Sequence, residues 1–527
     1  MTFDETYKAA YSFADPAADV GHVLREGAPA ADLPVRIPLR MMNRHGMIAG
    51  STGTGKTRTL QLLAEELSRA GVPVFLADVK GDLAGMCLPG ESNERLNARR
   101  QHPPEPFPVE FFSLTGNRGI QVRATVTSFG PILLGKVLDL TDVQQSVLAM
   151  VFKYCDDRRM PLLDFDDLRD VLNYLVTDGK EELKNYGGMS SATVGVLNRK
   201  MVELEQQGAA KFFGEPELDI QDLMRTVPTQ NGVRGVVNIL SLADVQDKPR
   251  LYSTFLMWLL GQFYYHMPEA GDPDKPKLVF FFDEAHQLFE DASSALVEHI
   301  EQVARLIRSK GIGVFFITQT PKDVDEDVLA QLGNRVQHAI RAFTPKDAKN
   351  LKATASTFPV SEHVDVAKSL TTLGIGEALV TALDPKGVPT AVAPVQIMAP
   401  CSWMSAIDDA QYQRVIAASA LNAKYSTPVN RESAHEILQA RLAKSASAPA
   451  EEKDEFGWKQ EQQADDFDWR GSAPKTRRRS TVSTSGSRRG RSTTERVLES
   501  AARGVANEVG HQAVRALKRG LLGMLKF

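Results

Sequence analysis

One eight-residue stretch, GSTGTGKT at residues 50–57, constrains the fold more than any other part of the sequence. It follows the apolar residues 47–49 and precedes residues 58–70, in which apolar positions recur at helical spacing. A glycine-rich loop between a strand and a helix binds phosphate, because its backbone N–H groups turn inward and the helix N-terminus adds positive charge. A loop that only caps the helix is the competing interpretation, and the complete pattern in its strand-to-helix context disfavours it.

The loop predicts a site for ATP and a divalent cation. Lys56 is expected to reach the β- and γ-phosphates, and the Thr57 hydroxyl to hold Mg²⁺. Lys56 is also a candidate catalytic residue, because a cation there neutralises charge on the transferred phosphoryl group. The predicted nucleotide-binding residues are Gly50, Ser51, Thr52, Gly53, Thr54, Gly55, Lys56, Thr57 and Arg58.

A second informative stretch lies more than 200 residues downstream. The apolar run LVFFF at residues 278–282 is followed by Asp283 and Glu284, as expected of a buried strand that ends in carboxylates. Asp283 is predicted to bind Mg²⁺, usually through water, and Glu284 to take a proton from the attacking water. Many strands end in acids, so this pattern is specific only in combination with the glycine loop.

Three further polar residues are candidates for the same reaction. Gln319 follows the apolar residues 313–318 and is expected to sense the γ-phosphate or to orient water, although it could simply cap its strand. Residues 335–343 are predicted to form a strand with Arg335 and Arg341 at its two ends. Each arginine is a candidate arginine finger for a neighbouring subunit, and for each the alternative of a surface arginine stays open.

Alternating strand and helix patterns predict an α/β fold with a largely parallel sheet flanked by helices. Further strands are expected at residues 35–39, 72–77, 109–114, 121–127, 236–242, 374–380 and 392–398, with residues 121–127 as an antiparallel edge. The predicted organisation is residues 1–129, the N-terminal segment and first part of the core; 130–226, a helical insertion; 227–430, the second part of the core; 431–494, a disordered linker; and 495–527, an amphipathic helix.

Composition excludes several other classes of protein. The formal net charge of −4 does not predict nucleic-acid binding by the whole chain. The three cysteines, Cys87, Cys155 and Cys401, are scattered without metal-ligand spacing, as expected in a reducing compartment. The N-terminus lacks a signal-peptide profile, and the most apolar stretch, residues 255–265, is about half the length of a membrane span. We therefore expect a cytoplasmic protein without an integral membrane segment.

The C-terminal tail has its own chemistry. Residues 475–491 are basic and rich in Ser, Thr and Gly, and would either grip a phosphate backbone or serve as a solvated linker. Residues 495–527 recover helical spacing with a net-basic end. This segment is predicted to dock on a protein partner or self-associate, with a membrane-surface helix as the alternative.

These motifs, in this order, resemble the HerA–FtsK class of ring-forming motor ATPases. The resemblance rests on the glycine loop, DVKGD at residues 78–82, Asp283-Glu284, Thr318-Gln319 and GIGEAL at residues 374–379. Within that class, NRHGMIAG at residues 43–50 and ADVKGDL at residues 77–83 are similar to the YjgR-like group, whose members carry a helicase HerA-like C-terminal domain. The resemblance covers roughly residues 20–400.

The resemblance implies a RecA-like P-loop NTPase core, Mg²⁺-dependent ATP hydrolysis and a homo-oligomer, such as a hexamer, with sites between subunits. HerA-like members place the arginine finger at the position matching Arg341, and FtsK-like members at the one matching Arg335. HerA proteins also carry a β-barrel before the glycine loop, whereas only about 45 residues precede it here. Because of that departure, the resemblance supports the predicted ATPase activity more directly than DNA loading or helicase activity.

The expected function is that of a motor ATPase acting on DNA as a helicase-like translocase. A nucleotide-gated scaffold that binds a protein partner through its tail, without helicase activity, is the main alternative. A pump for polypeptides is a third, because this class of motors also includes secretion ATPases.

Overall fold

Twelve strands of the described residues form one sheet, and the strand before the phosphate loop lies near its middle. The structure is a computed structural model that describes residues 1–289, 294–429 and 431–447. From one edge to the other the strands are β2 (Ala28–Pro38), β1 (Ala17–Arg25), β14 (Ala393–Ile397), β13 (Glu377–Thr381), β12 (Asn334–His338), β3 (Gly46–Ala49), β11 (Ile312–Thr318), β10 (Leu278–Phe282), β4 (Val74–Asp78), β9 (Val237–Ser241), β5 (Val109–Ser113) and β6 (Ile120–Gln121).

Strand direction divides this sheet into two parts. From β12 to β6 all neighbouring strands are parallel, whereas the pairs from β12 through β13, β14 and β1 to β2 are antiparallel. The predicted α/β fold with a largely parallel sheet is confirmed. Because β11 lies between β3 and β10, the strand of the loop and the strand of the acids are separated by one strand, and all three end at the same edge.

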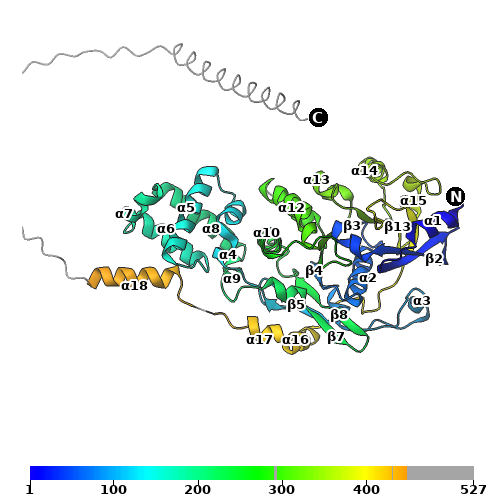
Figure 1. The fold of residues 1–527 in the computed structure, drawn as a ribbon, viewed down its shortest axis with the longest axis horizontal. Coiled ribbons are helices and arrows are strands. Elements are labelled where there is room, and N and C mark those ends of the chain that lie inside the picture. Colours follow the sequence, from blue (N-terminus) through cyan, green and yellow to red (C-terminus); the bar gives the residue numbers. More distant parts are fainter. Residues whose placement is uncertain (290–293, 430, 448–527) are drawn as a thin grey trace, which may run out of the picture. The chain divides into compact units, whose positions relative to one another are not determined.

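Helices cover both faces of the parallel part, as Figure 1 shows. Alternate side chains of the fully buried strand β10 enter different cores, with Phe280 in one and Phe281 in the other. The core that contains Phe281 is closed by α2 (Lys56–Arg69), and the core that contains Phe280 by α10 (Pro249–His266) and α12 (Ser294–Ile307). The apolar strand is therefore buried on both sides, and its polar C-terminal end is what reaches a cavity.

The residues before the loop complete the antiparallel edge. The helix α1 (Phe3–Tyr11) begins at a capping box on Thr2 and lies against this edge. The hydroxyl of Tyr7 donates to the carbonyl of Val392 at 2.8 Å, and that of Tyr11 donates to the carbonyl of Ala391 at 2.7 Å. The 3₁₀ helix η1 (Leu39–Arg44) then leads into β3.

A helical region follows the first part of the sheet. It contains α4 (Val126–Val137), α5 (Asp142–Arg158), α6 (Phe165–Val176), α7 (Lys180–Leu183), α8 (Ser191–Gln206), α9 (Ala209–Phe212) and the 3₁₀ helices η3 (Lys184–Tyr186) and η4 (Ile220–Met224). The hairpin of β7 (Thr226–Thr229) and β8 (Gly232–Gly235) returns the chain to the sheet. The apolar side chains of the region belong to the same core as Phe280, so the region is packed on the sheet rather than tethered to it.

Two helices from the end of the described chain also enter this core. They are α17 (Ala420–Tyr425) and α18 (Ala434–Ser447), which contribute Tyr425 and Leu438. The linker predicted to start at residue 431 therefore begins with a helix, and its boundary was placed too early. The rest of that linker and the amphipathic helix predicted at residues 495–527 lie outside the described residues, and so do the contacts predicted for them.

The remaining described helices are short or peripheral. They are η2 (Ala84–Cys87), α3 (Glu94–Asn97), α11 (His286–Phe289), η5 (Arg308–Lys310), η6 (Pro321–Asp323), α13 (Glu326–Leu329), α14 (Pro345–Ala355), α15 (Val366–Thr372) and α16 (Asp409–Ala418). Among all helices that the structure describes, none combines the length and the apolar character needed to cross a bilayer.

Two predicted strands extend well beyond the strands of the structure. Of residues 121–127, only Gln121 lies in a strand, the short β6, which is parallel to β5 rather than antiparallel. The chain then turns, because the Thr125 side chain caps α4 by accepting from Ser128 N–H. The strand predicted at residues 335–343 ends at His338, because the next carbonyl, of Ala339, bonds to the phosphate loop instead of to the sheet.

Candidate active site

The loop at residues 50–57 joins β3 to α2 in a conformation that needs its glycines. Gly53 and Gly55 have φ angles of 77° and 121°, which residues with a Cβ atom rarely adopt. Inside the loop, the Thr54 hydroxyl donates to the Ser51 carbonyl at 2.7 Å. The backbone of the loop is therefore wrapped tightly, and α2 begins immediately behind it at Lys56.

Residues that follow β12 and precede β13 hold the loop from behind. Ser51 N–H donates to the Ala339 carbonyl at 3.0 Å, and the Ser51 hydroxyl accepts from Arg341 N–H at 2.9 Å. Gly376 N–H donates to the Thr54 carbonyl at 2.9 Å. Three hydrogen bonds from backbone groups of two other segments therefore fix the conformation of the loop.

One cavity of about 330 Å³ brings the two predicted motifs together. It lies at the carboxyl ends of β3, β10 and β4, where a parallel sheet positions ligands. From the predicted sets, Thr52, Gly53, Gly55, Lys56, Thr57, Arg58, Asp283 and Glu284 line it, and three further residues join them: Lys80, Asp82 and Ile375. Lys56 and Asp283, 227 positions apart in the sequence, thus share one pocket.

Lys56 is held by the loop that it serves. Its ammonium donates to the carbonyls of Gly50, at 2.7 Å, and Ser51, at 3.3 Å. Burial lowers the pKa of Lys56, while the nearby charges of Glu284 and Asp283 act in the opposite direction. The side chain is thus a buried cation whose present partners are neutral carbonyls, an arrangement that favours exchange for a phosphate oxygen.

Asp283 is a buried carboxylate with one oxygen left unpaired. Only 2% of the residue is exposed, and its Oδ1 accepts from Glu284 N–H at 2.9 Å. Within the described part of the chain, Oδ2 has no hydrogen-bond partner. Burial, followed by the charge of Glu284, raises the pKa of Asp283 to about 7. An oxygen of this kind fits a divalent cation, which would supply the missing charge.

The protein offers few ligands of its own to such a cation. The described residues contain no group of three or more His, Cys, Asp or Glu side chains placed to hold a metal. Asp283 and the Thr57 hydroxyl on the same cavity fit Mg²⁺, which is usually bound by one or two protein oxygens with water and substrate phosphates completing the shell.

Glu284 has an uncommon backbone conformation and an ion-pair partner, Lys80, for which the sequence predicted no role. Its φ of 49° lies in the left-handed region, which is rare outside glycine. The Lys80 ammonium donates to Glu284 Oε1 at 2.5 Å, and Nδ1 of His286 lies 3.4 Å from Oε2. Lys80 belongs to the DVKGD segment, which the sequence already singled out, but the contact of Lys80 with Glu284 could not be predicted from it.

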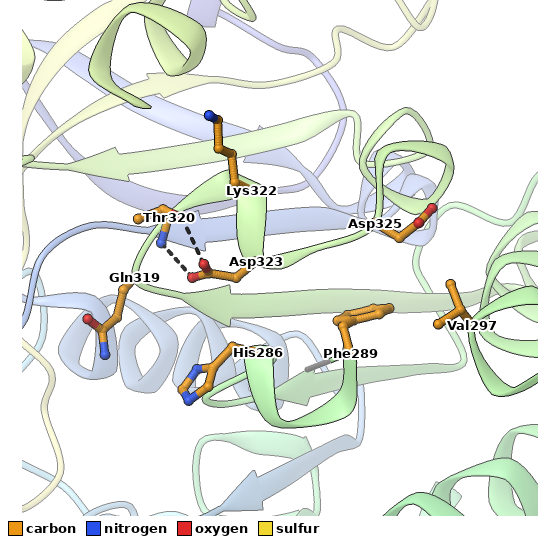
Figure 2. A pocket seen from close by; sticks show the side chains of 8 residues that line it. All are labelled: His286, Phe289, Val297, Gln319, Thr320, Lys322, Asp323 and Asp325. Atoms are coloured by element: carbon orange, nitrogen blue, oxygen red, sulfur yellow. Dashed lines mark hydrogen bonds between the residues drawn. The ribbon is translucent and has the colours of Figure 1, made fainter. Parts of the chain in front are cut away.

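Gln319 does not line this cavity. It is exposed just beyond β11 and faces a second pocket of about 630 Å³. His286, which follows β10, lines the same pocket (Figure 2). Next to it, Asp323 accepts from Thr320 N–H at 2.9 Å, which closes the turn after β11. The structure thus places Gln319 at the predicted edge of the sheet but in a neighbouring pocket.

The two candidate arginines lie near opposite ends of the strand β12. Arg335 is near the start of β12, and its guanidinium donates to the carbonyls of Leu332, at 3.3 Å, and Thr357, at 2.9 Å. Arg341 lies beyond the end of β12, beside the phosphate loop, with an exposed side chain. Arg335 is therefore engaged within its own subunit, whereas the Arg341 side chain is available at the carboxyl edge.

The loop after β3, the acid pair after β10 and the single strand between them define the class. The chain is a P-loop ATPase.

More specifically, it belongs to the helicase HerA-like C-terminal family, which it matches over residues 24–526. The DNA double-strand break repair helicase HerA of Saccharolobus solfataricus is 23% identical over 380 residues, 72% of this chain and 68% of that protein. A probable helicase of Methanocaldococcus jannaschii is 25% identical over 378 residues, 68% of this chain and 64% of that protein. The plasmid coupling protein TrwB, solved with a non-hydrolysable GTP analogue, gives a TM-score of 0.48 at 14% identity, over 78% of this chain and 95% of that one.

Proposed function

We propose that this protein hydrolyses ATP with Mg²⁺ as the motor subunit of a homo-oligomer, and that the motor acts on DNA as a helicase-like translocase. The observation that supports hydrolysis is the single cavity lined by Lys56, Asp283 and Glu284 at the ends of β3 and β10. Action on DNA is supported by family membership and by relatives that are DNA double-strand break repair helicases.

In the proposed reaction, water attacks the γ-phosphate in line with the leaving oxygen. Lys56 and the N–H groups of the loop stabilise the negative charge of the transferred group, and Glu284 orients the water and accepts its proton. Mg²⁺, held by Thr57 and Asp283, would neutralise charge on the phosphate oxygens. The loop and the acids line one pocket, and donors held in place by the fold in this way stabilise developing charge with little reorganisation.

Three further residues would act on the nucleotide from outside the cavity. Gln319 would report the γ-phosphate by turning from its neighbouring pocket toward Glu284. Arg341 is our preferred arginine finger for an adjacent subunit, because its side chain is exposed at the carboxyl edge. Arg335 would first have to release two carbonyls of its own subunit.

The proposal is tested by ATP turnover in the Lys56→Ala variant. Turnover should fall to background, because the buried cation is lost, and wild-type turnover should stop when EDTA removes Mg²⁺. Lys386→Ala, in an exposed turn, is the matched control and should behave as the wild type. Unaltered hydrolysis by Lys56→Ala, with a normal melting temperature, would rule out the proposed site.

DNA action and assembly need separate measurements. A motor on DNA should hydrolyse ATP faster when single- or double-stranded DNA is added, and should form a larger particle in mass photometry with an ATP analogue. Hydrolysis that ignores both kinds of DNA would favour the nucleotide-gated scaffold. An active strict monomer would remove the role of Arg341 in a neighbouring site.

A further inference from the structure

The segment after β4 is built to present one lysine to the nucleotide cavity. Asp78, at the end of β4, is 1% exposed, and its carboxylate accepts from the N–H groups of Gly81, at 2.7 Å, and Leu83, at 3.2 Å. Gly81 has a φ of 77°, which allows the tight turn between these two bonds. The turn fixes the backbone of Lys80, so its ammonium starts from a defined position.

From this turn Lys80 reaches the neighbouring strand. The strands β4 and β10 are adjacent and parallel, with Ala77 opposite Phe282, so the turn after β4 and the acids after β10 begin at the same level. The ammonium of Lys80 lies 2.5 Å from Glu284 Oε1. The Lys80 side chain is 50% exposed and that of Glu284 8% exposed, and both line the 330 Å³ cavity.

This contact treats the two oxygens of Glu284 differently. Oε1 is anchored by Lys80, whereas Oε2 accepts no hydrogen bond among the described residues and has Nδ1 of His286 3.4 Å away. The backbone of Glu284 is in the left-handed region, a conformation that a residue other than glycine keeps only where its surroundings hold it. One anchored and one unpaired oxygen is the arrangement required of a carboxylate that must orient a water molecule.

We propose that Lys80 is a positioning residue, whose ammonium holds Oε1 of Glu284 so that Oε2 can orient the attacking water. The inference rests on the proposed ATP hydrolysis and adds a residue to it. Lys80 itself gives up no proton and takes none; the proton of the water goes to Glu284. A direct contact of Lys80 with the γ-phosphate is the alternative role of the same side chain, and it predicts a different result.

The test compares Lys80→Met, which keeps the length without the charge, with Lys80→Arg, which keeps the charge. We expect Lys80→Met to lower kcat roughly 10- to 100-fold at unchanged KM for ATP, and Lys80→Arg to retain most of the activity. Lys386→Met is the control for loss of a surface lysine and should keep wild-type rates. Lys80→Gln is a second uncharged variant. Both variants should fold, because the Lys80 side chain is half-exposed and contributes little to core packing.

A double variant separates action through Glu284 from direct action. If Lys80 works through that carboxylate, Lys80→Met should cause no further loss of the single-turnover rate in a Glu284→Gln background. ATP and ADP should bind Lys80→Met with wild-type affinities. The inference is overturned by wild-type kcat in Lys80→Met, by additive losses in the double variant, or by weakened binding of ATP but not of ADP.

Failure of this inference is distinguishable from failure of the proposed function. If the wild type hydrolyses ATP, Lys56→Ala does not, and Lys80→Met retains wild-type kcat, only the role of Lys80 is refuted. If Lys56→Ala hydrolyses ATP as fast as the wild type, the proposed function itself is refuted.

Discussion

Two buried aspartates in different regions of this protein have opposite surroundings. Asp167 lies in the helical region and Asp283 at the carboxyl edge of the sheet, and each is 2% exposed. Asp167 accepts from the N–H groups of Leu163, at 2.8 Å, and His435, at 2.9 Å, and also from the Ser433 hydroxyl. Asp283 accepts one hydrogen bond, and its other oxygen has no partner among the described residues.

The difference separates a structural carboxylate from one prepared for a ligand. Burying a charge without partners costs free energy, so a native fold normally pairs it, as it does around Asp167. At Asp283 the missing partners coincide with a cavity and with a raised pKa, which is the combination expected at a functional site. Equal burial therefore marks a structural carboxylate in one region and a ligand site in the other. Replacing each aspartate by asparagine should change folding stability in opposite directions.

The largest expected effect is on catalysis at the sheet edge. Glu284→Gln should lower kcat roughly 100- to 10,000-fold, because the amide cannot accept the proton of the attacking water. The melting temperature should change little, since the side chain has nearly the same shape. Glu203→Gln, which removes an exposed carboxylate paired with Arg250, is the control and should leave kcat unaltered. Equal kcat for wild type and Glu284→Gln would remove this residue from the mechanism.

The next effect is on stability, at the satisfied aspartate. Asp167→Asn should reduce the free energy of unfolding by about 1–3 kcal/mol, because an amide nitrogen would face N–H and O–H donors that now point at a carboxylate. The loss can be measured by urea denaturation. Because Ser433 and His435 connect this carboxylate to α18, limited proteolysis near α18 should also become faster. A variant as stable as the wild type would show that these hydrogen bonds contribute nothing net.

A third test extends the comparison to a paired group that titrates. His45 is fully buried; its Nδ1 accepts from Val314 N–H at 3.0 Å, and its Nε2–H donates to the Ala304 carbonyl. Burial lowers the pKa of His45 to about 4, against about 6.5 in an unfolded chain. Between these values the unfolded state binds the proton, so folding stability falls as the pH falls, by up to about 1.4 kcal/mol per pH unit.

The measurement compares the wild type with His45→Asn, whose amide oxygen can still accept from Val314. Urea denaturation at pH 7.5 and at pH 5 should show a smaller loss of stability in the variant than in the wild type. Other groups, such as Asp78 with its pKa raised to about 6, titrate in both proteins and cancel in the difference. Parallel pH profiles for the two proteins would mean that the burial of a neutral His45 does not cause the loss of folding stability at low pH.

The parts of the site that could be predicted from the sequence are those encoded in contiguous residues. The loop before α2 and the acids after β10 each carry their own strand context, so both were placed correctly, and their meeting follows from the rule for parallel sheets. The contact between Lys80 and Glu284 joins two segments whose separation in the sequence hides it. The sequence shows Lys80 in the DVKGD segment, but its partner Glu284 follows only once β4 and β10 are known to be neighbours.

The wrong boundaries have the same cause. The strand predicted through Phe343 stops at His338 because Ala339 turns its carbonyl to Ser51, a tertiary contact that outweighs local propensity. The linker predicted from residue 431 begins with α18, because this helix packs on a region more than 250 residues earlier, where Asp167 accepts from the N–H of His435. Local pattern predicts the elements, while long-range partners decide where they end.

The smallest effect is the most direct test of the comparison. Asp283→Asn should increase the free energy of unfolding by about 1 kcal/mol in EDTA without nucleotide, because a buried charge beside Glu284 disappears and no hydrogen bond to Oδ2 is lost. Asp167→Asn, at equal burial, should shift stability in the opposite direction. With Mg²⁺ and an ATP analogue the wild type should be stabilised by ligand binding, and Asp283→Asn less so, which would reverse their order. If Asp283→Asn destabilises the free protein as much as Asp167→Asn does, then the unpaired oxygen has a partner in solution and the contrast between the two aspartates is lost.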